Sequence, residues 1–259
     1  MLLENRVAII SGIGPGMGRD ISLALAREGA DVVLAARRAE LMEEVAAEVR
    51  ALGRRAVCVP TDIAQADQCK RLAERAQAEL GRIDVLVNNA FKGGVEPTTE
   101  AASMDEWRKI FDVNVFGSMH LSQAVIPFMK QHGGGSIIFI NSMSMRVIEP
   151  RFGGYAASKG ALMIAAQTMA RELGAYRIRV NSVVPGYIWG PALEGYFKQL
   201  AKQQGTTPQA IYDQIAARTA LHHIPTSEEI AGAVVFFASD LSRAITGQAL
   251  DVNGGHFFH

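Results

Sequence analysis

Two alternating patterns of hydrophobic and polar residues run along the 259-residue chain. Short runs rich in β-branched residues predict strands, and the stretches between them, with apolar residues three and four positions apart, predict amphipathic helices. The strand-like runs cover residues 7–11, 31–36, 56–60, 85–88, 136–141, 179–185 and 248–251. The helical patterns at 18–28 and 40–52 each end on a glycine, Gly29 and Gly53. This alternation predicts an α/β fold, a doubly wound parallel sheet of about seven strands with helices on both faces.

The length predicts a single domain over residues 1–259, because a chain of this size builds one large core or at most two small ones. One segment, about 187–225, breaks the alternation. Helical pieces replace a strand there, and aromatic residues accumulate: Trp189, Tyr196, Phe197 and Tyr212. We expect this segment to be a lid over a pocket.

The charge balance argues against a polyanionic partner. The chain is 49% hydrophobic, and its 26 basic residues match 26 acidic ones, so no net field attracts nucleic acid or an anionic membrane. The two cysteines, Cys58 and Cys69, have no Cys-x-x-Cys spacing and are expected to be buried free thiols. The N-terminus leads directly into a strand, and no apolar run reaches membrane-spanning length. These features predict a soluble, unprocessed cytoplasmic protein whose partner is a small molecule.

A glycine-rich loop follows the first predicted strand and opens the first predicted helix. It reads Ser11-Gly12-Ile13-Gly14-Pro15-Gly16-Met17-Gly18. A backbone without side chains can approach a pyrophosphate closely, and the amides at a helix N-terminus favour that negative charge. The alternative is a tight strand-to-helix turn, but its place between strand and helix favours dinucleotide binding in a Rossmann-type fold.

Tyr155 and Lys159 are four residues apart, and Ser142 precedes the tyrosine by thirteen. On a helix, residues four apart share a face, so the ammonium group is expected beside the phenol. A nearby cation favours the phenolate, which predicts that the pKa of Tyr155 is lowered toward the working range. Such a tyrosine can give or take a proton.

Loop, pair and spacing together resemble the short-chain dehydrogenase/reductase family, in its form of about 250 residues, nearly from end to end. The family's phosphate loop is matched at Ser11, Gly12, Gly16 and Gly18. Other matches lie at Asp62 in Thr-Asp-Ile, at 88–90, at Asn114, and at Ser142, Tyr155 and Lys159. Two later segments, 181–186 and 246–255, resemble the part that backs the nicotinamide and the closing strand.

The resemblance implies a role for each matching residue. Tyr155 would exchange a proton with the substrate oxygen, and Ser142 would hold that oxygen. Lys159 would bind the nicotinamide ribose, and Asn114 would hold a water that connects Lys159 to solvent. The implied cofactor contacts are Ser11, Gly12, Gly14, Gly16, Met17, Gly18, Arg37, Arg38, Asp62, Ile63, Asn89, Ala90, Tyr155, Lys159, Pro185, Gly186 and Ile188. The four-residue spacing of tyrosine and lysine also resembles carbonyl reductases and alcohol dehydrogenases more than enoyl reductases.

The choice of nicotinamide depends on the end of the second predicted strand. No carboxylate stands there to bind the ribose hydroxyls of NAD(H), and Ala36 is followed by Arg37 and Arg38. An arginine can form charge-assisted bonds to a 2′-phosphate, which favours NADP(H) and leaves NAD(H) possible. The alternative is that both arginines merely flank a helix start in solvent.

Several residues depart from the family pattern around the expected substrate pocket. Phe91 replaces a glycine after Asn-Asn-Ala and is expected either to pack on the sheet edge or to line the pocket. Gly190 stands near the usual place of a threonine that contacts the carboxamide, so Tyr187, Trp189 or backbone must hold that group. Either Met143 or Met145, after Ser142, is expected in the pocket wall.

These features predict an NAD(P)(H)-dependent oxidoreductase with a preference for NADPH that interconverts a ketone and a secondary alcohol on a bulky, mainly apolar molecule. A steroid, a terpenoid, an aromatic ketone or an acyl thioester would each fit. The alternatives are a 3-oxoacyl thioester reductase and a non-catalytic NADP-binding sensor on the same fold.

Two further expectations concern metals and assembly. His222, His223 and the tail 254–259 lack companion ligands, so no metal site is predicted. Apolar residues expected to point outward on the long helices, such as Met163, Ile164 and Met169, predict a homo-tetramer or dimer by analogy with members of the family. The aromatic pair 257–258 could reach a neighbouring subunit's site.

Overall fold

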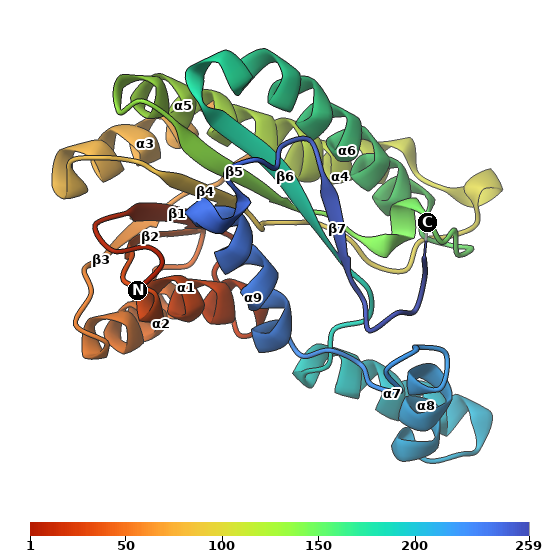
Figure 1. Cartoon of the computed structure of the whole chain (residues 1–259). Coiled ribbons are helices and arrows are strands. Elements are labelled where there is room, and N and C mark those ends of the chain that lie inside the picture. The colour runs from red at the N-terminus through yellow and green to blue at the C-terminus, as the bar shows by residue number, and fades with distance from the viewer. Residues whose placement is uncertain (259) are drawn as a thin grey trace.

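A computed structural model of the chain, which describes residues 1–258, has a single parallel sheet covered by helices on both faces (Figure 1). Its strands are β1 Val7–Ser11, β2 Asp31–Ala36, β3 Ala56–Pro60, β4 Val85–Asn88, β5 Gly135–Ile140, β6 Ile178–Pro185 and β7 Ala249–Val252. Its α-helices are α1 Met17–Arg27, α2 Ala39–Ala51, α3 Ala66–Leu80, α4 Met104–Phe111, α5 Ser118–Gln131, α6 Gly153–Leu173, α7 Pro191–Gln204, α8 Pro208–Ala216 and α9 Ser227–Ala238. The predicted fold class is confirmed, and the predicted element ends agree within one residue.

The strand order is β3-β2-β1-β4-β5-β6-β7, with every neighbouring pair parallel. The order reverses between β1 and β4, so the chain leaves these two adjacent strands in opposite directions. Loops that diverge at such a point open a crevice at the carboxyl ends of the strands, where ligands bind in this class of fold.

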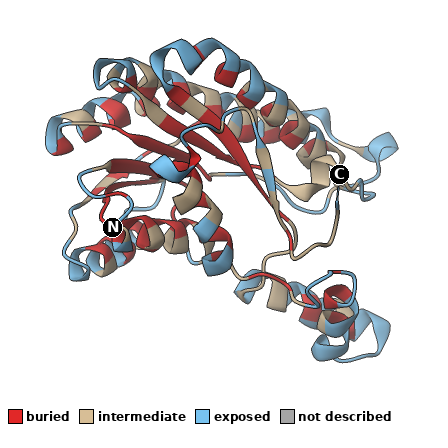
Figure 2. Cartoon of the chain, in the orientation of Figure 1, coloured by how far each residue is buried: buried red, intermediate tan, exposed pale blue. Residues whose placement is uncertain are grey.

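The core has two layers, one on each face of the sheet. Along β1, Val7 and Ile9 pack with α3, α5 and α6, whereas Ala8 and Ile10 pack with α1, α2 and α9. Both faces of the central strands are therefore covered, which explains why strands such as β1 are continuous apolar runs rather than alternating ones (Figure 2). The expected outward position of Met169 is wrong: its side chain is 5% exposed and packs in the layer on the α6 face.

Two helices, α7 and α8, extend away from this sandwich at the lower right of Figure 1. They have a small core of their own, which is built from Phe197, Ala201, Ile211, Ile215, Ala216 and Ile224. The helical character predicted for residues 187–225 is thus present, and the segment is anchored to the main body at both ends.

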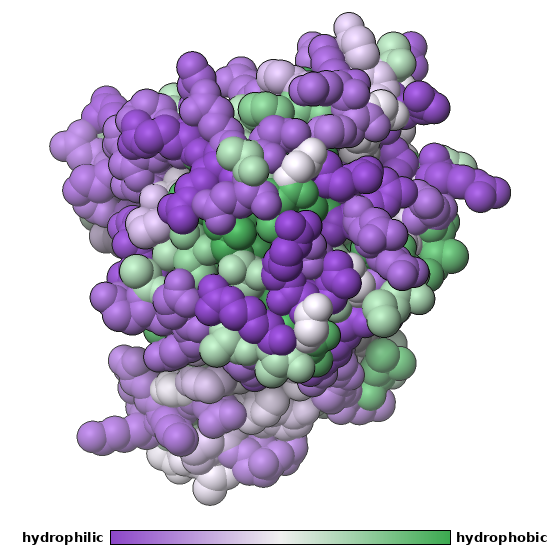
Figure 3. Space-filling model, turned by 90° about the vertical axis from the view of Figure 1, so that its left-hand side faces the viewer, coloured by the Kyte–Doolittle hydropathy of each residue, from purple (hydrophilic) through white to green (hydrophobic). Residues whose placement is uncertain are grey.

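The surface accords with the balanced composition. On the face shown in Figure 3, hydrophilic residues predominate, and hydrophobic ones gather near the middle. Within residues 1–258, no helix is both long and apolar enough to cross a membrane. The cysteines are free as expected, although Cys58 is only partly buried, unlike Cys69.

Candidate functional site

The glycine loop after β1 combines close packing with open space. A Cβ atom at Gly12, whose φ is +82°, would lie 2.5 Å from Cα of Ala90, and one at Gly18 would collide with the carbonyl oxygen of Gly12. By contrast, a Cβ atom at Gly14 or Gly16 would meet nothing within 4 Å. The N-terminus of α1 has no side-chain cap, so its amides face this space. The loop therefore fits the pyrophosphate of a dinucleotide.

Two predicted cofactor residues hold the loop in place. The hydroxyl oxygen of Ser11 accepts hydrogen bonds from the backbone N–H groups of Asn89 (3.2 Å) and Ala90 (3.3 Å). The side-chain amide of Asn89 donates to the carbonyl oxygens of Ser11 (3.1 Å) and Gly12 (2.9 Å). These bonds tie the ends of β1 and β4 together, so the side chains of Ser11 and Asn89 shape the crevice.

The residues expected near the adenosine lie along the carboxyl edges of β2 and β3. Arg37 and Arg38 are exposed, and neither forms an ion pair with another described residue. The carboxylate of Asp62 accepts a hydrogen bond from the backbone N–H of Ala64 (3.1 Å). Ile63 is 5% exposed, so its side chain belongs to the core. Two exposed guanidinium groups without a described carboxylate partner therefore follow β2.

Tyr155, Lys159 and Ser142 converge at the carboxyl edge of β5. Tyr155 and Lys159 lie on α6, and the Lys159 ammonium is 5.7 Å from the centre of the tyrosine ring. Ser142 follows β5 and hydrogen-bonds the Tyr155 side chain. The Lys159 ammonium donates to the carbonyl oxygen of Ile140 (2.8 Å), and this bond fixes the ammonium one helical turn beyond the tyrosine.

Burial dominates the electrostatics of this group. It raises the pKa of Tyr155, against the opposing effect of the Ser142 hydrogen bond. The expected lowering of this pKa by Lys159 is therefore wrong for this structure. Burial also lowers the pKa of Lys159 to about 7, so the cation itself is only partly charged near neutral pH. The phenol is consequently neutral and able to donate a proton.

The buried lysine predicts a specific pH dependence of stability. Because the folded pKa of about 7 lies below the ordinary lysine pKa of 10.5, the unfolded chain binds more protons between these values, and stability rises with pH. We expect the free energy of unfolding to increase by about 1–2 kcal/mol more in the wild type than in Lys159→Met between about pH 7 and 8.5. Denaturant titrations of the free protein at both pH values measure this difference. An equal change in the free energy of unfolding between the two pH values in both proteins would contradict it.

Asn114 organises the backbone beside the site. It lies in a π-helical segment, Asp112–Gly117, which interrupts the long helix expected around it. Its oxygen accepts from the backbone N–H of Lys92 (2.7 Å), and its nitrogen donates to the carbonyl oxygen of Lys92 (2.9 Å) and to the Ser158 hydroxyl (2.9 Å). The side chain is thus hydrogen-bonded to the protein, and the second lone pair of its oxygen can still accept a hydrogen bond from a water.

Phe91 and the two methionines lie near Tyr155 and Ser142. Phe91 is 64% exposed, and its ring centre lies 6.2 Å from that of Tyr155 in an edge-to-face arrangement. Met143 and Met145 are partly buried in the short turn after Ser142. A Cβ atom at Gly186 would lie 3.3 Å from the Met143 sulfur, so that side chain packs under the segment after β6.

The aromatic residues after β6 divide between two environments. Trp189 packs against Tyr212 (ring centres 4.6 Å apart) and Phe197 (5.8 Å) inside the core of α7 and α8. Tyr187 packs against the edge of the same core and also contacts the ring of His256, with ring centres 5.8 Å apart. Trp189 is therefore a structural anchor of the α7–α8 segment as well as a candidate pocket residue.

Some site features were not anticipated from the sequence. Ser158 lies between Tyr155 and Lys159, and its hydroxyl donates to the Tyr155 carbonyl oxygen (2.7 Å). Glu96, in the loop after β4, accepts hydrogen bonds from the start of α6. Loop glutamates are common on surfaces, so no local signal distinguishes Glu96. The tail residue His259 lies outside the described part of the chain, and within that part no three metal-ligating side chains converge.

The fold and the site define a dinucleotide-binding oxidoreductase. The family model adh_short_C2, described as enoyl-(acyl carrier protein) reductase, matches residues 12–256. The chain belongs to the short-chain dehydrogenase/reductase family, and it is an enzyme of the kind that acts on CH–OH groups with NAD(P).

Characterised relatives match over nearly the whole chain. The 7α-hydroxysteroid dehydrogenase of Escherichia coli K12 is 35% identical over 98% of this chain and 94% of its own. The 3-oxoacyl-(acyl-carrier-protein) reductase FabG of Thermotoga maritima is 32% identical over 98% of this chain and 99% of its own.

Solved structures of relatives share this fold. A 7α-hydroxysteroid dehydrogenase complexed with NADH and 7-oxoglycochenodeoxycholic acid is 35% identical, with a TM-score of 0.88 over 98% of this chain and 94% of that chain. The carveol dehydrogenase of Mycobacterium avium in complex with NAD is 29% identical, with a TM-score of 0.92 over 98% of both chains.

Proposed function

We propose that this enzyme interconverts a ketone and a secondary alcohol on a bulky, mainly apolar small molecule, using NADP(H). The observation that carries the proposal is the placement of Tyr155, Ser142 and Lys159 together at the carboxyl edge of the sheet that also carries the open glycine loop. Tyr155 and Ser142 can share one substrate oxygen, and the crevice is beside them.

In the reductive direction, the nicotinamide supplies hydride to the carbonyl carbon when it is bound. Tyr155 donates its phenol proton to the carbonyl oxygen, while the Ser142 hydroxyl holds that oxygen in place. Lys159 lies below Tyr155, where its ammonium can bind the nicotinamide ribose and replace the proton that the phenol loses. Asn114 keeps the neighbouring backbone in place and offers one lone pair to a water in the relay.

The cofactor would lie across the switch point of the sheet. The loop from Gly12 to Gly18 would hold the pyrophosphate, and Asp62 would bind near the adenine. Arg37 and Arg38 would bind a 2′-phosphate, which is the basis for NADP(H). Ile63, Ala90, Pro185, Gly186 and Ile188 would contribute backbone and apolar contacts to the adenosine and nicotinamide halves.

The substrate would lie between Tyr155 and the α7–α8 segment, which we propose is a lid within a single domain. Phe91 gives the site an exposed aromatic wall, and Met145 and Tyr187 would add to it. Two relatives are named for a steroid alcohol and for carveol, a terpenoid alcohol. A polycyclic or terpenoid ketone therefore suits the proposal.

A 3-oxoacyl thioester is the second candidate substrate. It is favoured by the relative named for that activity and by the acyl-carrier description of the matching family model. An exposed aromatic ring beside Tyr155 favours a rigid apolar body over a flexible acyl chain, which is why we rank it second.

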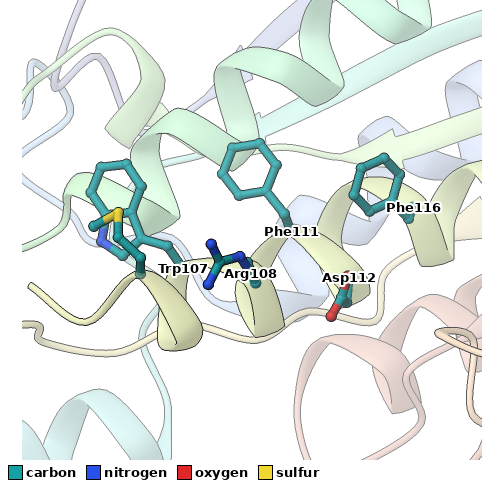
Figure 4. A pocket seen from close by; sticks show the side chains of 6 residues that line it. Trp107, Arg108, Phe111, Asp112 and Phe116 are labelled. Atoms are coloured by element: carbon teal, nitrogen blue, oxygen red, sulfur yellow. The ribbon is translucent and has the colours of Figure 1, made fainter.

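We also propose that copies of the chain assemble into a tetramer or a dimer. Met104, Phe116 and Ile164 are 48, 53 and 62% exposed on α4, the π segment and α6. A cavity of about 310 Å³ on the outside of α4 is lined by Met104, Trp107, Arg108, Phe111, Asp112 and Phe116 (Figure 4). This apolar surface suits contact with a second copy.

Two free thiols in such a protein suit a reducing cytoplasm.

The proposed substrate class can be tested with NADPH and a panel of carbonyl compounds. We expect turnover with cyclic and aromatic ketones, and slower turnover with 3-oxoacyl thioesters. In Phe91→Gly, kcat/KM for the best bulky ketone should fall about tenfold, because one aromatic contact is worth about 1–2 kcal/mol. Leu241→Ala, which removes an exposed side chain far from the site, serves as control. Faster turnover of acyl thioesters would favour the second candidate.

A further inference from the structure

The loop between β4 and α4 is attached to the catalytic residues at several points. The backbone of Lys92 is held by the Asn114 side chain through both its N–H and its carbonyl oxygen. A Cβ atom at Gly93 would lie 2.8 Å from the Tyr155 ring, so the loop runs directly against the phenol. Phe91, at the start of the loop, contacts the same ring.

Glu96 attaches the other end of this loop to the first turn of α6. One carboxylate oxygen accepts a hydrogen bond from the backbone N–H of Gly154 (3.1 Å), and the other accepts from that of Tyr155 (3.1 Å). The residue that precedes α6, Phe152, provides no side-chain cap. Glu96 therefore satisfies two of the N–H groups that a helix leaves unpaired at its start, and its negative charge suits that end of the helix dipole.

The backbone of Glu96 is fixed as well. Its N–H donates to the carbonyl oxygen of Arg151 (2.7 Å), and the Arg151 guanidinium donates to the Glu96 carbonyl oxygen (2.9 Å). A Cβ atom at Gly154 would lie 2.9 Å from the Glu96 carboxylate and 2.9 Å from the Trp107 indole. A glycine before the tyrosine thus lets a carboxylate from another loop reach the helix start.

The bonds form one closed circuit around Tyr155. The Tyr155 N–H donates to Glu96, and its carbonyl oxygen accepts from the Ser158 hydroxyl. Ser158 in turn accepts from Asn114, which holds Lys92, four residues before Glu96 in the chain. Both backbone polar groups of the catalytic tyrosine are therefore bonded to side chains of this circuit.

From this circuit we propose that Glu96 is a positioning residue for Tyr155, and that it couples the substrate-facing loop to the proton donor. This inference rests on the proposed function of Tyr155. Glu96 does not touch the reacting atoms. It fixes the first turn of α6, and a displacement of the phenol by about 1 Å relative to Ser142 can cost about a hundredfold in rate.

The test uses Glu96→Ala and Glu96→Gln in the full chain, with Glu100→Ala as matched control. Glu100 is an exposed glutamate of the same connection whose carboxylate accepts from the Thr98 hydroxyl (3.4 Å). With the best ketone, we expect kcat to fall about 10- to 100-fold in Glu96→Ala, with the Kd for NADPH changed less than about twofold. Glu96→Gln keeps one acceptor oxygen and the volume, so it should recover part of the loss.

Two readouts do not require turnover. Amide hydrogen exchange should become faster at residues 153–158 in Glu96→Ala and stay unchanged in Glu100→Ala. A more loosely held Tyr155 is also less buried, so its ultraviolet phenolate titration, isolated by subtracting Tyr155→Phe, should move to lower pH. Unchanged exchange or titration in Glu96→Ala overturns the inference, as does faster exchange with unchanged kcat. A wild type inactive on every carbonyl compound would instead reject the proposed function.

Discussion

Tyr155→Phe is expected to lower kcat by about 10²- to 10⁴-fold and to leave NADPH binding nearly unchanged, because the substitution removes the phenolic hydroxyl that carries the transferable proton. The ring stays, so its edge-to-face contact with Phe91 and its fit against Gly93 are retained. Single-turnover kinetics with the best ketone measure the loss in the chemical step, and fluorescence titration measures the Kd for NADPH.

Tyr176→Phe is the matched control. That tyrosine is 48% exposed beyond the end of α6, where Lys130 lies over its ring, and it should keep wild-type kinetics. Turnover by Tyr155→Phe equal to that of the wild type would show that another group supplies the proton. Loss of NADPH binding would show that the substitution acts on the cofactor site.

Arg37→Ala has the second large expected effect, a 10- to 100-fold weaker binding of NADPH. A charge-assisted hydrogen bond to a phosphate is worth about 1.5–3 kcal/mol, and each 1.4 kcal/mol is about tenfold in Kd. NADH has no 2′-phosphate, so its Kd should change less than about threefold. Combining the change with Arg38→Ala should remove the preference for NADPH.

The control for the cofactor experiment is Arg243→Ala, which removes an exposed arginine just before β7. It should leave both Kd values unchanged. If the wild type binds NADH more tightly than NADPH, the assignment of Arg37 is wrong. NAD(H), which is bound in the two structural relatives, would then be the cofactor of this enzyme as well.

Much of the scaffold could be predicted from local patterns. Strands such as β1 are buried on both faces, so their apolar runs stand out from the amphipathic helices. The glycine loop could be predicted because it lies between a strand pattern and a helix pattern. The structure adds the reason for its glycines: Gly12 and Gly18 have no room for a Cβ atom, and Gly14 and Gly16 face open space.

The residues that the sequence-based predictions placed wrongly or missed are ones whose behaviour depends on their three-dimensional surroundings. The lysine four residues after Tyr155 was expected to lower the pKa of the phenol, but burial, which no spacing reveals, raises that pKa. Met169 looked outward on the helix pattern, yet it packs against the sheet. Glu96 went unnoticed because its partners, Gly154 and Tyr155, lie more than fifty residues away in the chain.

The most direct test of the proposed reaction follows the transferred hydride by a deuterium label. Wild-type enzyme is given a bulky ketone and NADPH with deuterium at the transferring C4 position, and the product is examined by mass spectrometry. We expect an alcohol with one deuterium on the carbinol carbon, formed at a rate that Tyr155→Phe reduces at least about a hundredfold. An unlabelled alcohol, reduction of a carbon–carbon double bond in place of the carbonyl, or an equal rate in the mutant would contradict it.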